Sequence, residues 1–336
     1  MSIVDEVLKG NRLAAARLLT MVENRAPEAA AALRALHRHT GRAHIIGITG
    51  PAGAGKSTLV GGLVATLRSR GRTVGVVAVD PSSPFTGGAL LGDRIRMGRL
   101  SGDPGVYIRS MANRGAMGGL SAATAGAVDV LDAMGFDVVV VETVGAGQSD
   151  VEVARLAQTT VVVLMPGMGD DIQMIKAGIL EVGDVYVVNK ADKEGADTAL
   201  AELGTLVGMA PQRPGGAPAI VRTVATSGEG LDDLATAVDA HREALRKTGG
   251  LHAHEKSRSR SLLIELLKQE FLALACRSAS TGEMDRLVEE IAARRMDPYL
   301  AAERLAAGVV LKGGSCPGPA AEPVTARRRG RDDLSG

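Results

Sequence analysis

The residues with the most specific chemistry are GPAGAGKS, from Gly50 to Ser57. They match the pattern G-x-x-x-x-G-K-[ST], follow the apolar run HIIGIT at 44–49, and precede a helix-length stretch at 58–70. Glycines in such a loop let several backbone N–H groups point at one anion, and a helix N-terminus adds partial positive charge. The pattern predicts a phosphate-binding loop in which Lys56 reaches the β- and γ-phosphates and the Ser57 hydroxyl binds Mg²⁺. The nucleotide-binding residues expected from this loop are Gly53, Ala54, Gly55, Lys56, Ser57 and Thr58.

A second motif, N-K-x-D, begins at Asn189 and includes Lys190 and Asp192. A carboxylate at this place can accept hydrogen bonds from the ring N–H and the exocyclic amine of guanine. Adenine offers neither donor there, so ATP would leave a buried carboxylate unpaired. A helix-capping Asn or Asp explains many four-residue matches. This one lies at the end of the apolar run DVYVV, downstream of a phosphate loop, and together the two motifs favour GTP over ATP.

A third nucleotide-facing loop is expected after the run AIVRTVAT, at Val224 and Ala225. G proteins usually carry Ser-Ala at this place. The contact is mainly a backbone N–H donated to the guanine oxygen, so the change from Ser-Ala to Val-Ala weakens the match without breaking it.

Three acids stand at the ends of apolar runs or in loops near the expected γ-phosphate: Asp80, Asp93 and Glu142. Ligands of open α/β sheets sit at the carboxyl ends of the strands, so acids there are placed for function. The usual magnesium-associated acid at a strand end is Asp, and this chain has Glu142. The alternative for each acid is a helix cap or a solvated loop residue.

The apolar runs that would position these residues alternate with helix-length stretches: HIIGIT, RTVGVVAVD, FDVVVVETVG, TTVVVLMPG, DVYVVNKAD and AIVRTVAT. Continuous β-branched runs of this kind are typical of buried parallel strands. They predict an α/β fold, a P-loop NTPase domain with a mostly parallel central sheet, over 41–248. We expect a two-helix N-terminal arm at 1–40, a C-terminal helical region at 249–311 and a disordered tail at 312–336. The C-terminal region carries an apolar stripe formed by Leu262, Leu263, Leu266, Leu267 and Phe271.

Composition excludes several classes of protein. The net charge of +1 over 336 residues gives no overall field toward nucleic acid, and 2% aromatic residues without Trp argue against a base-stacking surface. No apolar run of about 18 residues exists, so we expect no membrane span. Two cysteines are too few for a disulfide framework or a four-cysteine zinc site. The N-terminus has no apolar signal core, and we expect a cytoplasmic protein.

Longer segments are similar to the MeaB/ArgK family of G proteins: PSSPFTGGALLGDRIRM, SMANRGAMGGL, ETVGAGQSD and PGMGDDIQMIKAGILEVGDVYVVNKAD. The resemblance covers about residues 1–310. It implies a GTPase chaperone that gates cofactor loading and protects an adenosylcobalamin-dependent acyl-CoA mutase, chiefly methylmalonyl-CoA mutase. It also implies that the acids matching Asp80, Asp93 and Glu142 surround Mg²⁺, that Gln173 and Lys176 lie in an extra switch, and that the C-terminal helices form a homodimer.

Hydrolysis needs charge neutralisation at the γ-phosphate and a positioned water molecule. Lys56 and Mg²⁺, with Glu142 beside them, supply the first. Gln148 is the candidate for orienting the water, and Lys176 could supply positive charge once a partner orders its loop; the alternative for Lys176 is a solvated helix lysine. Such an arrangement predicts slow intrinsic hydrolysis of GTP to GDP that a partner accelerates.

Two other functions remain open. A nickel-delivery GTPase would need metal ligands near the nucleotide, but Cys276 and Cys316 lie outside the predicted GTPase domain, and His252 and His254 lie in a predicted linker. A kinase acting on a small metabolite would need an acceptor pocket and a catalytic base, and the N-K-x-D motif argues against ATP.

Overall fold

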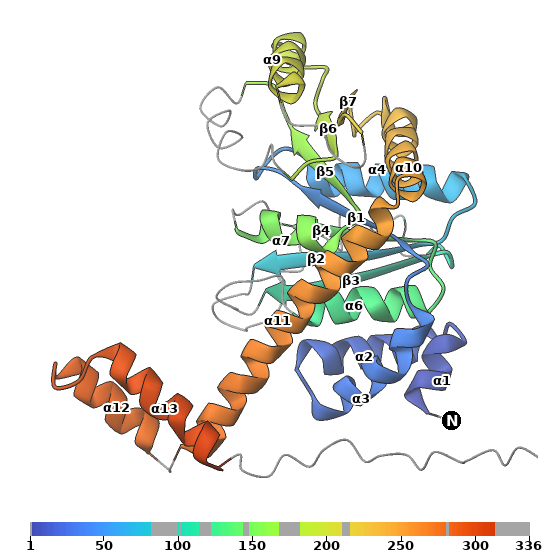
Figure 1. Ribbon diagram of the computed structural model, residues 1–336. Helices are drawn as coiled ribbons and strands as arrows, with labels where there is room; N and C mark the ends of the chain where they lie inside the picture. Colours follow the sequence, from blue (N-terminus) through green and yellow to red (C-terminus); the bar gives the residue numbers. More distant parts are fainter. Residues whose placement is uncertain are drawn as a thin grey trace, which may run out of the picture. The chain divides into compact units, whose positions relative to one another are not determined.

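The computed structural model describes residues 2–81, 100, 102–113, 122–143, 148–167, 182–209, 216–279 and 282–312 (Figure 1). By internal contacts the chain divides into two compact units, residues 1–265 and 266–336. The described helices are α1 Ile3–Leu8, α2 Arg12–Glu23, α3 Pro27–Leu36, the 3₁₀ helix η1 His37–His39, α4 Lys56–Ser69, α6 Ala122–Ala133, α7 Gln148–Leu156, α9 Ala196–Gly208, α10 Leu231–Lys247, α11 Gly250–Ser278, α12 Glu283–Ala292 and α13 Pro298–Lys312. None of them is both long and apolar enough to cross a membrane.

The first unit is built on a parallel sheet in the order β3-β2-β4-β1-β5-β6-β7. Its strands are β1 His44–Thr49, β2 Val74–Pro81, β3 Val106–Asn113, β4 Val138–Thr143, β5 Thr159–Leu164, β6 Val185–Val188 and β7 Ala219–Arg222. All six residues of β1, β4 and β5 are buried, as expected for parallel strands covered on both faces. The sheet confirms the predicted α/β fold class.

Helices cover the two faces of the sheet in separate layers (Figure 1). On one face α4 and α10 pack over alternate strand residues such as Ile46 and Val140. On the other face α6 and α7 pack over the intervening residues such as Ile45 and Val139, and α9 covers Tyr186. Each strand therefore contributes side chains to two cores, which explains why its sequence is apolar without alternation.

The N-terminal segment forms three α-helices and not the two that the apolar spacing predicted. Gly10, with φ of 77°, ends the first helix, and the Asn11 side chain caps the second by accepting from the N–H groups of Leu13 and Ala14. The apolar pattern continues across this break, so the pattern does not indicate it. Pro27 is the first residue of α3, a position that suits the fixed φ of proline. The three helices pack against α6 within the same core.

Two further predictions were wrong or incomplete. The sequence did not predict β3, because Arg109, Ser110 and Asn113 interrupt its apolar residues. Among the described strands, β3 is an edge strand that pairs only with β2. His252 and His254 lie in α11, where a linker was predicted. The predicted disordered tail lies outside the described residues apart from Lys312, the last residue of α13.

Candidate nucleotide site

The glycine-rich loop joins β1 to α4 and uses backbone conformations that other residues rarely adopt. Gly50, Gly53 and Gly55 have φ values of 133°, 81° and 89°. A Cβ atom at Gly55 would lie 2.6 Å from the Nδ2 atom of Asn189, and one at Gly50 would meet the Val163 carbonyl. The strand–loop–helix order and these glycines are what a phosphate-binding loop requires.

Lys56 is the first residue of α4 and is 6% exposed. Its ammonium donates to the carbonyl oxygens of Gly50 at 2.8 Å and Pro51 at 3.0 Å. The side chain thus folds back over the loop, which keeps the positive charge beside the backbone that would surround the phosphates. Thr58 follows on the exposed side of the same first turn as Ser57.

Two of the four predicted metal ligands, Ser57 and Glu142, contact one another at the carboxyl end of β4. The Ser57 hydroxyl donates to Oε1 of Glu142 at 2.6 Å, and Glu142 is 4% exposed. Glu142 pairs with Ala78 of β2 across the sheet, so Asp80 lies two residues further along the neighbouring strand, with its side chain outside the described part. Asp93 lies outside the described residues.

A hydroxyl and a carboxylate in contact are oxygen ligands of the kind that Mg²⁺ prefers, so the residues present fit the ion. In the described ranges no group of three or more His, Cys, Asp or Glu side chains stands ready to hold a metal. A magnesium ion here would therefore complete its coordination with phosphate oxygens and water, which is its usual behaviour in nucleotide sites.

Asn189 connects the phosphate loop to the loop after β7. It follows β6 directly and is 2% exposed. Its Nδ2 donates to the carbonyl of Ala54 at 2.8 Å, while its Oδ1 accepts from the N–H of Ala225 at 3.1 Å and from the Thr223 hydroxyl at 3.2 Å. Sequence reasoning placed Asn189 in the site but missed Thr223, because nothing in a lone threonine before Val224 signals this role.

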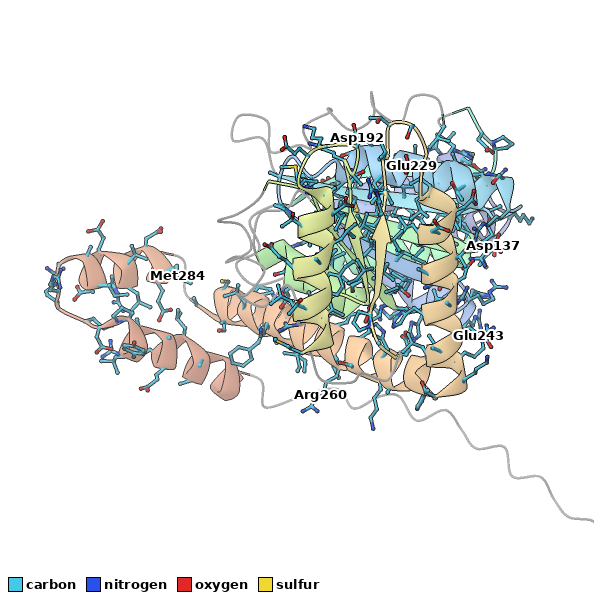
Figure 2. The ribbon with its side chains drawn as sticks, turned by 90° about the horizontal axis from the view of Figure 1, so that it is seen from above. Asp137, Asp192, Glu229, Glu243, Arg260 and Met284 are labelled. Atoms are coloured by element: carbon cyan, nitrogen blue, oxygen red, sulfur yellow. The ribbon has the colours of Figure 1, made fainter. Side chains whose placement is uncertain are left out.

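Lys190 extends the same connection under backbone strain. It is one of three non-glycine residues with positive φ in the described part of the chain, at 55°. Its ammonium donates to the Gly53 carbonyl at 2.7 Å. Asp192, two residues on, is exposed, and in Figure 2 it is labelled at the same end of the unit as Glu229, whose carbonyl accepts from the Val224 N–H. The two predicted base-facing loops are therefore neighbours.

The residues proposed to act on the attacking water are less completely described. Gln148 begins α7, but its side chain lies outside the described part. Gln173 and Lys176, the predicted switch residues, lie outside the described residues. The N–H of Ala225 is donated to Asn189, so a contact of this loop with guanine stays a prediction.

Comparisons with known proteins point to one family of GTPases. Residues 15–280 match a family described as methylmalonyl-CoA mutase-associated GTPase MeaB. A putative GTPase of Pyrococcus abyssi is 45% identical over 90% of this chain and 94% of its own length. The GTPase ArgK of Escherichia coli is 35% identical, covering 80% and 84%. The mitochondrial methylmalonic aciduria type A homolog of Caenorhabditis elegans is 30% identical, covering 90% and 81%.

A solved structure shares the fold at lower identity. The crystal structure of an LAO/AO transport system kinase superposes with a TM-score of 0.67 over 92% of this chain and 96% of that one, at 24% identity. At this identity the likeness speaks for the fold alone.

Proposed function

The chain belongs to the MeaB family of GTPases, and from this we propose that it binds GTP and GDP with Mg²⁺ at the site described and hydrolyses GTP slowly. Through that cycle it gates cofactor loading and protects an adenosylcobalamin-dependent acyl-CoA mutase. Methylmalonyl-CoA mutase is the mutase that the family description names. The family membership supports the GTPase activity. The action on a mutase goes one step further and needs its own test.

One observation carries the choice of nucleotide. Asn189 forms hydrogen bonds both to the phosphate loop, at Ala54, and to the loop after β7, at Thr223 and Ala225. These bonds hold the N-K-x-D segment at a fixed distance from the phosphate loop, so one nucleotide can reach both. Asp192 at the end of that segment then reads the guanine N–H donors, as its carboxylate chemistry requires.

We propose the following roles for the chain's own residues. The backbone N–H groups of Gly53 to Thr58 surround the phosphates, and Lys56 adds a fixed positive charge at the β/γ bridge. Ser57 and Glu142, together with Asp80 and Asp93, would hold Mg²⁺, which would supply charge neutralisation at the γ-phosphate. Gln148 orients the attacking water, and Lys176 adds positive charge when the partner binds.

A competition titration tests the nucleotide assignment against the kinase alternative. Fluorescent GDP bound to the full chain with Mg²⁺ should be displaced by GTP, while ATP at a hundredfold excess leaves it bound. Displacement by ATP at concentrations similar to GTP would instead favour a kinase. The nickel alternative predicts tight Ni²⁺ binding, so absence of nickel binding at micromolar concentration would remove it.

A binding assay tests the partner. Purified methylmalonyl-CoA mutase should be retained by the immobilised chain, and the amount retained should differ between the GDP form and a form loaded with a non-hydrolysable GTP analogue. Equal retention in both forms, or none in either, would contradict a nucleotide-gated chaperone and leave the GTPase assignment intact.

We also propose a homodimer through the C-terminal helices. Apolar side chains of α11 are exposed: Leu267 by 59%, Phe271 by 49% and Leu272 by 63%, with Val288 of α12 at 56%. Such a surface favours burial against another chain. Light scattering should give a dimer mass for the full chain, and Phe271→Lys with Leu272→Lys should shift it toward the monomer with GDP binding retained. A monomeric wild type would overturn this assembly.

A further inference from the structure

A cavity lies at the opposite end of the sheet from the phosphate loop. It has a volume of about 430 Å³, and its lining includes Arg42, Arg72, Asp137 and Arg242. The first three precede β1, β2 and β4 in the chain, so the cavity lies at the amino ends of these strands. The phosphate loop follows β1 at its carboxyl end. Six residues of β1, at roughly 3.3 Å each, separate the two, so the cavity is not part of the nucleotide site.

Positive charge dominates this cavity. Three arginines face it from separate segments, against one lining carboxylate, Asp137. That carboxylate accepts from the backbone N–H and the hydroxyl of Thr73, each at 2.8 Å, and these hydrogen bonds lower the pKa of Asp137, so it is ionised. Arg72 is paired outside the lining, with Asp239 at 2.8 Å. Counted together, the three arginines and the carboxylates of Asp137 and Asp239 leave one positive charge to be balanced.

Arg42 and Arg242 are the two remaining arginines of the lining. Arg242 donates to the carbonyl of Arg42 at 2.9 Å, and Arg42 donates to the carbonyl of His39 at 3.2 Å. In the described part of the chain neither guanidinium lies within ion-pair distance of a carboxylate, and the Nε of Arg242 is buried without a hydrogen-bond partner. Arg242 is half-buried, and an unpaired charge there is stabilised when an anion binds beside it.

Neighbouring groups respond to the same field. Burial, then the positive charges of Arg246 and Arg72, lower the pKa of Arg242, against the smaller opposing effect of the carboxylates of Asp239 and Asp132. His44 beneath it is fully buried, and burial followed by the charges of Arg242 and Arg72 holds its pKa well below the usual value. His44 is therefore neutral and adds no charge, which leaves the arginines as the source of the positive potential.

We propose that this cavity binds a phosphate group, free or carried on a small molecule, through the guanidinium groups of Arg42 and Arg242. A guanidinium presents paired N–H donors that match two oxygens of a phosphate, and a bound phosphate anion balances the remaining positive charge. The volume accommodates a phosphate group with several further atoms attached. The proposal is independent of the nucleotide assignment, because it rests on residues at the other end of the strands.

Calorimetric titration tests the site in the full chain saturated with GDP and Mg²⁺, with inorganic phosphate and methyl phosphate as probes and chloride at equal ionic strength as reference. Phosphate should bind the wild type, and Arg242→Gln should weaken it at least about tenfold through loss of a charged hydrogen bond. Arg42→Gln, on a different segment, should weaken it similarly. Tighter binding of methyl phosphate than of inorganic phosphate would identify a carried phosphate group as the ligand, and equal or weaker binding the free ion.

Two matched variants decide where the phosphate sits. Arg246→Gln removes the same charge from the next turn of α10, where Arg246 is exposed and pairs with Glu243, and should leave affinity within about twofold. Lys56→Ala disturbs the phosphate loop and should leave the binding unchanged. No phosphate binding to the wild type, equal weakening in Arg246→Gln, or loss in Lys56→Ala would each overturn the proposal.

Discussion

At the scale of the residue, we expect turnover to depend most on Lys56. Its ammonium is already held over the phosphate loop by two carbonyl oxygens, at 2.8 and 3.0 Å. Lys56→Ala removes the fixed cation at the β/γ-phosphates, and single-turnover GTP hydrolysis should fall by at least about a hundredfold. Lys193→Ala, an exposed lysine beyond the N-K-x-D segment, is the control and should hydrolyse GTP at the wild-type rate. Normal turnover in Lys56→Ala would refute the phosphate-loop assignment.

We expect Asp192 to decide which base is bound. Asp192→Asn replaces two acceptor oxygens with one acceptor and one donor, which complements xanthine in place of guanine. Affinity for GDP should fall about a hundredfold, since a guanine donor loses its charged acceptor, while affinity for xanthosine diphosphate should rise. Equilibrium titration with both nucleotides measures the exchange, and Glu194→Gln at a nearby exposed position should alter neither. Unchanged GDP affinity in Asp192→Asn would mean that this carboxylate does not contact the base.

His44 predicts how stability depends on pH. It is fully buried, its Nε2 lies 2.8 Å from the Thr159 hydroxyl, and burial holds its pKa well below 6.5. Below about pH 6.5, His44 is therefore protonated in the unfolded chain but stays neutral in the folded one. This difference lowers the stability of the fold as pH falls through that value. The slope reaches about 1.4 kcal/mol per pH unit.

Urea unfolding between pH 5.5 and 7.5 measures this slope. His44→Gln keeps a group able to bond Thr159 but cannot titrate, and its stability should depend less on pH than that of the wild type. His252→Gln, on the exposed side of α11, is the control and should retain the wild-type slope. An identical slope in His44→Gln would show that His44 does not cause the loss.

The phosphate loop and the N-K-x-D segment were predictable from sequence because each is a short local pattern. The bonds that join them were not. Asn189 reaches Ala54 across 135 residues and Thr223 across 34 residues, and no local spacing encodes such a contact. The contact of Ser57 with Glu142 spans 85 residues, and it was expected only because strand ends of a parallel sheet converge.

At the scale of the element, one ion pair holds the first half of α11 to the sheet unit. Arg258, 7% exposed, donates to Asp129 of α6 at 2.6 Å. Burial raises the pKa of Asp129, against the attraction of Arg258. Arg258→Met should therefore destabilise the protein by about 3 kcal/mol, because it leaves a buried carboxylate without its cation.

Thermal unfolding with a matched pair of variants checks this account of α11. Arg260→Met, on the exposed side of the same helix and labelled in Figure 2, should change the melting temperature little. Adding Asp129→Asn to Arg258→Met should recover much of the loss, since the uncompensated charge disappears. No recovery in the double variant would show that the loss comes from packing of the arginine stem.

Elements were predictable where a pattern filled the whole element. All six predicted apolar runs became strands, and in five of them, β1, β2, β4, β5 and β6, the described side chains are buried on both faces, while the edge strand β7 is only partly buried. The edge strand β3 and the break at Gly10 were not predicted, because each depends on its structural surroundings and not on the apolar pattern alone. An edge strand tolerates polar residues, and a helix can stop at Gly-Asn while the apolar spacing continues beyond it.

At the scale of the whole molecule, the proposed function requires that nucleotide and mutase affect one another. If the mutase binds the GTP and GDP forms with different affinity, then by linkage it changes the affinity of the chain for the two nucleotides by the same factor. The nucleotide site lies in the first unit, and the partner-dependent charge is assigned to Lys176, outside the described residues. Coupling is therefore a property of the complex and must be measured there.

The most direct measurement is single-turnover hydrolysis of GTP by the full chain, with and without saturating methylmalonyl-CoA mutase. The account predicts a slow rate alone and a severalfold faster rate with the mutase, and Lys176→Ala should retain GTP binding but lose the acceleration. Serum albumin at the same concentration is the control and should leave the rate unchanged. Equal rates with and without the mutase would contradict the proposed chaperone function.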